Sequence, residues 1–348
     1  MKEMENVLEV KNLRVSFRGY GGRVQAVRGV DFHLKRGETI AIVGESGSGK
    51  SVSVKSVMGI LPRNAVIDEG SILYEGRELV GLTEKEYEEV RGRKIGLIFQ
   101  DPLSSLNPLM KIGRQIAEVF TVNQKISKEE AKAKALKLME DVGIPDPALR
   151  YNQYPFQFSG GMRQRIVIAI ALANDPDILI CDEPTTALDV TVQARILQLI
   201  KKIKEERNIS VIFITHDLGV VANIADRVYV MYAGKVVEEG TCEEVFLDPR
   251  HPYTWALLTS IPDMKSKKKL LSIPGSPPNM LYPPKGDAFA ARNRYAMQID
   301  LKMEPPMFQV SATHYAATWL LHPYAPPYEP PEELQERIRM MREEAGLS

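Results

Sequence analysis

The chain has 348 residues, which is enough for one large α/β domain with an appendage or for two modest domains. Its 45 basic and 45 acidic side chains balance to a net charge of zero, so it lacks the basic excess typical of nucleic-acid-binding proteins, and we expect no nucleic-acid partner. No apolar run approaches the roughly 18 residues needed to cross a bilayer, so we expect any membrane role to come through partners.

Two features of the chain favour a cytosolic protein. The first seven residues are charged and lack the apolar core of a secretory signal. The two cysteines, Cys181 and Cys242, are too few for a disulfide framework, and Cys181 lies in an apolar run where a buried, inert thiol is expected.

A phosphate-binding motif comes first along the chain. The β-branched run 40–43 predicts a buried parallel strand, and residues 52–60 predict a helix. Between them the pattern GxxxxGK[ST] is complete. Its members, here called the phosphate loop, are Gly44, Glu45, Ser46, Gly47, Ser48, Gly49, Lys50 and Ser51.

The residue types of this loop suit a bound nucleotide. Glycines let the backbone wrap closely around an oxyanion, toward which backbone N–H groups and the helix N-terminus point. Lys50 can reach the β- and γ-phosphates, and Ser51 can bind Mg²⁺. We therefore predict an ATP site here.

A mostly helical insert is expected from about residue 83 to 164. It contains a strand at 95–99 and a helix at 127–142, which starts at a serine and stops at Gly143. Near its end lies the sequence Phe-Ser-Gly-Gly-Met-Arg-Gln-Arg, residues 158–165.

Two later apolar strands end in polar residues. Strand 178–181 runs into Asp182 and Glu183, and strand 210–215 runs into His216. The carboxyl ends of parallel strands form the ligand-binding crevice of α/β proteins. We predict that Asp182 holds Mg²⁺ and that Glu183 polarises the attacking water.

Residues 158–165 resemble the signature loop of ABC ATPases, usually written LSGGQ, although Phe158 and Met162 depart from that consensus. The resemblance covers roughly residues 7 to 245. It implies an α/β fold: a P-loop ABC ATPase core with a parallel sheet flanked by helices, an N-terminal antiparallel β-layer, a helical subdomain and a C-terminal extension. We expect the nucleotide-binding domain at 1–250, with its helical subdomain at about 83–164, and the extension at 251–348.

The resemblance also implies roles for single residues. Gln100 matches the Q-loop glutamine, expected to act in catalysis and to bind Mg²⁺. His216 matches the histidine at the γ-phosphate, and Asp189 the key residue of the loop Ala187-Leu188-Asp189. Phe17 is the expected adenine-stacking residue, with Tyr20 as the alternative. In this family the signature loop of one subunit caps the ATP of the other, so Ser159, Gly160 and Gly161 would serve a partner.

Two further stretches resemble the oligopeptide/dipeptide importer branch: residues 99–108, and residues 248–254 together with 273–278. This implies a second ABC ATPase (a heterodimer rather than a self-dimer), two transmembrane permeases, an extracellular substrate-binding protein and a location at the cytoplasmic face of the membrane. Cargo stays open, because nickel, glutathione or another small solute would suit the same ATPase. A non-transport ABC ATPase is a remote alternative, since no coiled-coil arm or zinc module is evident.

The tail departs from its branch at four positions. Many members carry cysteines there, which in some bind an iron–sulfur cluster; here the matching residues are Asp287, Asn293, Asp300 and Thr318. None is a thiolate, so no iron–sulfur cluster is expected, and ordinary polar packing is predicted instead. A basic cluster at 265–269 predicts a solvated linker, and residues 332–345 predict a terminal helix with Leu334, Ile338 and Met341 on one face.

Overall fold

The computed structural model describes residues 5–186, 188–261, 273–344 and 346, so the basic cluster at 265–269 and Ala187 lie outside the described residues. The chain divides into two compact units. The first contains Met1–Asn6, Leu34–Glu38 and Gly81–Ile214. The second contains Val7–His33, Thr39–Val80 and Thr215–Ser348.

A group of parallel strands forms the sheet of the first unit. β7 (Ile178–Asp182) pairs on one side with β6 (Ile95–Ile98) and on the other with β8 (Ser210–Thr215). β7 and β8 are buried along their whole length, as parallel strands covered on both faces must be. Their short, mostly apolar sequences made them predictable, and all three predicted strands are confirmed.

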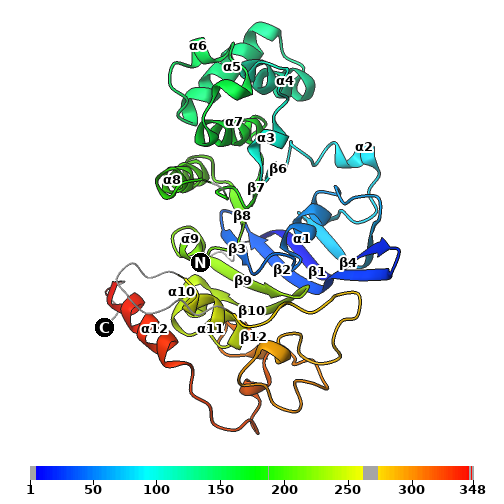
Figure 1. The fold of residues 1–348 in the computed structure, drawn as a ribbon. Coiled ribbons are helices and arrows are strands. Elements are labelled where there is room, and N and C mark those ends of the chain that lie inside the picture. The colour runs from blue at the N-terminus through cyan, green and yellow to red at the C-terminus, as the bar shows by residue number, and fades with distance from the viewer. Residues whose placement is uncertain (1–4, 187, 262–272, 345, 347–348) are drawn as a thin grey trace. The chain divides into compact units, whose positions relative to one another are not determined.

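Helices make up most of the rest of the first unit. Between β6 and β7 the chain forms a cluster in which α4 packs against α5 and α7 (Figure 1). The predicted helix at 127–142 is confirmed as α5, where Ser127 accepts the N–H of Glu130 and Gly143 has a φ of +76°. The helices of this unit are α2 (Glu84–Tyr87), α3 (Pro102–Ser105), α4 (Ile112–Gln124), α5 (Lys128–Asp141), α6 (Pro147–Arg150), the 3-10 turn η1 (Pro155–Gln157), α7 (Gly160–Leu172) and α8 (Val190–Arg207).

The second unit contains the predicted antiparallel β-layer. Its strand order is β2-β1-β4-β5. In β1 the residues Leu8 and Phe17 lie opposite Tyr74 and Ala65 of β4. The strands are β1 (Asn6–Gly19), β2 (Gly22–Lys35), β4 (Ala65–Tyr74) and β5 (Arg77–Glu78).

A second group of strands in this unit, part of an eight-stranded sheet, joins the nucleotide-binding sequence to the extension. β3 (Thr39–Val43) runs parallel to β9 (Arg227–Tyr232), which pairs with β10 (Lys235–Thr241). β10 then pairs with β12 (Tyr315–Ala316), and β12 with β11 (Phe308–Gln309). The extension therefore adds two short strands to the sheet that carries β3.

The helices of the second unit include α1 (Lys50–Val57), which follows β3. Within the described residues no helix is long and apolar enough to cross a membrane. The remaining helical segments are α9 (Leu218–Val221), α10 (Cys242–Leu247), α11 (Pro252–Thr259), η2 (Ala290–Arg292), η3 (Trp319–Leu321) and α12 (Glu332–Glu344).

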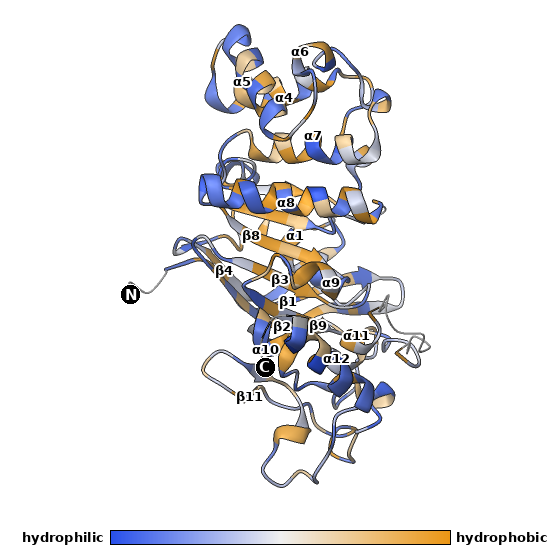
Figure 2. Ribbon diagram, turned by 90° about the vertical axis from the view of Figure 1, so that its left-hand side faces the viewer, coloured by the Kyte–Doolittle hydropathy of each residue, from blue (hydrophilic) through white to orange (hydrophobic). Residues whose placement is uncertain are grey.

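One hydrophobic cluster is shared by the strands and the extension of the second unit. It combines Val43 of β3 and Val230 of β9 with Trp255 of α11 and Phe289. Figure 2 shows the contrast in hydropathy between the apolar strand β3 and the mostly polar helix α12. The predicted face of α12 is confirmed, because Leu334 is fully buried, and Ile338 and Met341 pack on the same cluster.

Candidate functional site

The phosphate loop leaves the end of β3 and enters α1, and its glycines do two different jobs. Gly44, Gly47 and Gly49 all have positive φ, at +151°, +80° and +101°. A Cβ on Gly44 would overlap the carbonyl oxygen of Met231, and one on Gly49 would lie 2.6 Å from that of Ala26, whereas Gly47 faces open space. Two of the glycines thus let the loop pack against its own unit, and only Gly47 leaves room on the open side.

The polar groups of this loop suit an anion. The Lys50 ammonium is buried and donates to the carbonyl oxygens of Gly44 (2.7 Å) and Glu45 (2.9 Å). The Ser48 hydroxyl is buried and, within the described part of the chain, has no hydrogen-bond partner. Since buried hydroxyls are normally paired, this group fits an oxygen supplied by a ligand. The loop therefore fits the phosphates of a nucleotide.

Glu45, which was predicted as part of the nucleotide site, is hydrogen-bonded to two residues of the extension. Its carboxylate accepts two hydrogen bonds from Arg292, at 2.6 and 2.9 Å, and its backbone N–H donates to the Tyr253 hydroxyl at 2.8 Å. A free carboxylate here would repel phosphate. Neither partner could be predicted from the sequence, because nothing local marks an arginine 247 positions away.

The carboxyl end of β7 carries the predicted acidic pair. Asp182 ends the strand and is buried, and Glu183 follows with a φ of +48°. The Glu183 carboxylate accepts hydrogen bonds from the Gln100 amide (3.1 Å) and the Thr186 hydroxyl (3.0 Å). A positive φ in a residue with a side chain is uncommon and concentrates at functional sites. The first unit thus brings Gln100 and Glu183 into contact.

The predicted signature loop, Ser159 to Gly161, begins α7. Ser159 is its N-cap and accepts the N–H of Met162 at 3.4 Å. A Cβ on Gly161 would lie 2.5 Å from Cγ1 of Val192, at the start of α8. Asp189 is the N-cap of α8 and accepts the N–H of Val192 at 2.9 Å. The signature loop and the segment beginning with Asp189 therefore lie together.

The other two predicted residues lie in the second unit, as the phosphate loop does. Phe17 is half-buried on β1, while Tyr20 is fully exposed. His216 follows β8 and is exposed, and Asp217 beside it caps α9. Gln100, Asp182, Glu183, Asp189 and the signature loop belong to the first unit.

The four positions where many branch members carry cysteine are buried polar residues. Each side chain accepts a backbone N–H within three positions: those of Phe289, Tyr295, Met297 and Leu320. Burial, together with the nearby charges of Asp300 and Glu304, raises the pKa of Asp287 to about 6. Among the described residues no group of three or more His, Cys, Asp or Glu side chains could hold a metal ion. The turns of the extension are therefore stabilised by capping.

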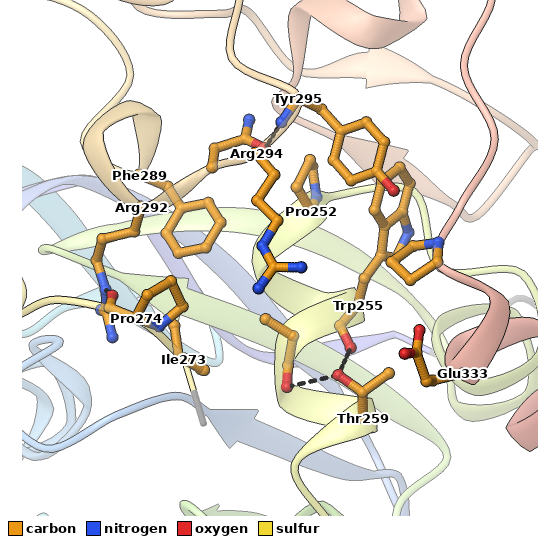
Figure 3. Close-up of a pocket in the computed structure, with 13 residues that line it drawn as sticks. Pro252, Trp255, Thr259, Ile273, Pro274, Phe289, Arg292, Arg294, Tyr295 and Glu333 are labelled. Carbon is orange, nitrogen blue, oxygen red and sulfur yellow. Dashed lines mark hydrogen bonds between the residues drawn. The ribbon is translucent and has the colours of Figure 1, made fainter. Parts of the chain in front are cut away.

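A hollow of about 90 Å³ lies inside the extension, and no predicted ATP-site residue lines it. Figure 3 shows the Arg294 side chain pointing into this hollow, with Trp255 and Tyr295 on one side and Phe289 on the other. In the same view the end of Arg292 is directed away from the centre of the hollow.

Known proteins match the chain along almost its whole length. The family model described as ABC transporter matches residues 27–186, and the model for the C-terminal region of oligopeptide/dipeptide transporters matches residues 237–299. The oligopeptide transport ATP-binding protein OppD of Bacillus subtilis is 59% identical over 98% of this chain and 96% of its own. The dipeptide transport ATP-binding protein DppD of Lactococcus lactis is 56% identical over 98% and 99%.

Solved structures give the same fold. A dimeric ATP-binding cassette in a post-hydrolysis state, bound to ADP and Pi, is 30% identical with a TM-score of 0.61, over 68% of this chain and 98% of its own. The cbiO1 subunit of an ABC transporter complex from Clostridium perfringens is 29% identical with a TM-score of 0.61, over 70% and 92%. The chain therefore belongs to the oligopeptide/dipeptide branch of the ABC-transporter ATP-binding subunits, and it is an ATP-binding, ATP-hydrolysing enzyme.

Proposed function

We propose that this chain powers the import of oligopeptides or dipeptides by hydrolysing ATP at the cytoplasmic face of the membrane. The cargo assignment is supported by relatives at 54 to 59% identity that are named for oligopeptide or dipeptide transport. In this proposal residues 1–250 form the nucleotide-binding domain, with a helical subdomain at about 83–164, and residues 251–348 form the importer-type extension. An importer for nickel, glutathione or another small solute is the alternative.

ATP is held by its phosphates in the phosphate loop and by its adenine against Phe17. Lys50 leaves the carbonyl oxygens of Gly44 and Glu45 for the phosphates. The Ser48 hydroxyl, which has no partner among the residues described, supplies a further hydrogen bond. Ser51, Asp182 and Gln100 are the residues that would hold Mg²⁺. When bound, that ion offsets the charge of the phosphates.

Hydrolysis depends on Glu183 as the general base. The observation that carries this role is its pair of hydrogen bonds from Gln100 and Thr186, which orient the carboxylate at the strand end beside Asp182. In this position Glu183 takes a proton from the attacking water while His216 contacts the γ-phosphate. Gln100 orients both the base and the water.

The signature loop serves the nucleotide of a second ATPase subunit. Ser159 uses an oxygen lone pair to cap α7, so its own O–H proton stays available as a donor to phosphate. Gly160 and Gly161 place the N-terminus of a 13-residue helix at the same point, where its dipole favours an anion. Asp189, beside this loop, completes the contact between subunits.

The complete machine in this proposal also contains two membrane permeases and an extracellular substrate-binding protein. The test is to recover tagged chain from gently solubilised membranes of the source organism and to identify its partners by mass spectrometry. Recovery of two multispanning proteins and a second ABC ATPase is expected. Recovery of ribosomal or DNA-repair proteins without a multispanning protein would refute the transport role.

A further inference from the structure

The extension grips the phosphate loop through one buried arginine. Arg292, at the end of η2, makes a bidentate pair with the carboxylate of Glu45, at 2.6 and 2.9 Å. The Arg292 side chain is 4% exposed and the Glu45 side chain 27%. Paired N–H donors fix the orientation of a carboxylate as well as its charge, which a lysine cannot reproduce.

Arg292 is itself held on its other sides. Its Nε donates to the carbonyl oxygen of Pro274 at 2.7 Å, and Nη1 also donates to the Tyr232 hydroxyl at 3.1 Å. Its guanidinium carbon lies 5.7 and 5.8 Å from the ring centres of Tyr232 and Phe289. The hydrogen bonds to Glu45 raise the pKa of Arg292 further, so the group stays charged.

A tyrosine of the same extension holds the backbone of Glu45. Tyr253 of α11 is fully buried, and its hydroxyl accepts the Glu45 N–H at 2.8 Å. The Tyr253 ring packs against Tyr232 and Phe289, the two rings that also flank Arg292. The third polar group of Glu45, its carbonyl oxygen, accepts a hydrogen bond from Lys50 at 2.9 Å. Contacts therefore run without a break from the extension through Glu45 to Lys50.

We infer that Arg292 and Tyr253 are positioning residues for ATP, through which the C-terminal extension holds the first half of the phosphate loop. The inference rests on the proposed role of that loop. Arg292 neutralises the Glu45 carboxylate and holds it in an ion pair, so that its charge does not repel the phosphates of ATP. Tyr253 fixes the peptide that begins the turn, so that residues 47–51 are presented to the nucleotide without further ordering.

The test measures the affinity for ATP of the full chain by isothermal titration, at a temperature where every variant is folded by circular dichroism. Arg292→Met is expected to weaken ATP binding about tenfold or more. Arg292→Lys keeps the charge but loses the paired N–H donors of the guanidinium, so the affinity for ATP is expected to fall several-fold. Arg294→Met is the matched control, since Arg294 lies two positions away, is exposed and points into the hollow of Figure 3. Its affinity should stay within about twofold of the unaltered chain.

A double variant separates positioning from general stability. Glu45→Gln/Arg292→Met removes the pair without leaving a buried charge unpaired, so it should fold even if Arg292→Met does not. Because the repelling carboxylate is also gone, it should recover part of the affinity lost in Arg292→Met, but not all of it. A merely structural arginine would lower the melting temperature and leave the affinity for ATP unchanged.

Lys50→Ala distinguishes a failure of the positioning role of Arg292 from a failure of the proposed nucleotide site. If Lys50→Ala abolishes ATP binding while Arg292→Met, or the double variant in its place, binds within twofold of the unaltered chain, the positioning role is overturned and the phosphate loop stands. If Lys50→Ala binds ATP normally, the proposed nucleotide site itself is wrong.

Discussion

The phosphate loop and the signature loop both carry serine and glycine ahead of a helix, yet the phosphate loop has more contacts that hold it to the rest of its unit. Gly44 and Gly49 are pressed against backbone carbonyls at positive φ, and Arg292 and Tyr253 hold Glu45. The signature loop is held less: Ser159 and Gly160 are exposed, the serine caps its own helix, and Gly161 is the residue of the three that packs closely, against Val192 of α8.

This difference matches the two proposed tasks. A loop that surrounds the phosphates of its own ATP gains affinity when its shape is fixed beforehand. A loop that approaches the ATP of another subunit has to stay accessible until the subunits meet. In this chain, therefore, similar sequences precede two helices, but the phosphate loop is held in place by tertiary contacts and the signature loop is an accessible helix N-terminus.

The largest expected difference in stability is between two variants, each of which replaces one glycine in one of the loops. Gly44→Ala puts a Cβ onto the carbonyl oxygen of Met231 at a φ that alanine disfavours, so the unfolding free energy should fall by about 3 kcal/mol or more. Gly160→Ala meets Leu188 at 3.6 Å, an ordinary contact, and should leave stability unchanged within about 0.5 kcal/mol. Urea unfolding of the two variants tests the comparison. Equal losses would show that the phosphate loop is no more tightly packed than the signature loop.

A smaller, pH-dependent effect is expected in the extension that fastens the phosphate loop. Asp287 accepts the N–H of Phe289, next to Arg292, and its pKa is raised to about 6. Because its pKa is raised, Asp287 stays protonated to a higher pH in the folded state than in the unfolded state. Its contribution to the free energy of unfolding is therefore fully present below pH 3.8 and is lost as pH rises through about 6. Asp287→Asn should therefore stabilise the protein by about 3 kcal/mol at pH 8 and have little effect at pH 4.

Thermal and urea unfolding of Asp287→Asn at both pH values checks this. The asparagine keeps the acceptor oxygen, so the hydrogen bond from the Phe289 N–H is retained. A gain of the same size at pH 4 and pH 8 would mean that the burial of a charge is not the cause.

A smaller loss of stability is expected from a change at the serine of the signature loop. Ser159→Ala removes an N-cap and should cost about 1 kcal/mol. Ser159→Asp keeps the cap but places a negative charge where a partner's phosphate would approach, so stability should be retained and ATP turnover of the assembled transporter lost. If Ser159→Asp turns over ATP as fast as the unaltered complex, this serine does not face the nucleotide.

Much of the fold and of the candidate site could be predicted from the sequence, because the signals that mark them are local. Apolar runs rich in β-branched residues mark the buried strands β3, β7 and β8, and the polar residues that follow β7 and β8 fall at strand ends. Ser127 and Gly143 bound α5 through capping chemistry that depends only on neighbours in sequence.

The rest depended on contacts between distant residues. The pairing of Glu45 with Arg292 joins positions 247 apart, and neither residue carries a local sign of it. The close packing of Gly44 on Met231 is likewise a tertiary contact, so the motif correctly predicted a glycine-rich loop but not that two of its glycines serve packing. The burial of all four polar positions in the extension was also invisible without the fold.

The most direct test of the central claim is to compare ATP binding and ATP hydrolysis by Glu183→Gln in the complex assembled with its partners. Glu206→Gln, an exposed change on α8 of the same unit, is the control. We predict that Glu183→Gln binds ATP within about threefold of the unaltered complex while turnover falls at least about a hundredfold, the lower range for loss of a general base. Hydrolysis by Glu183→Gln at nearly the rate of Glu206→Gln would contradict the claim that Glu183, oriented by Gln100, activates the water.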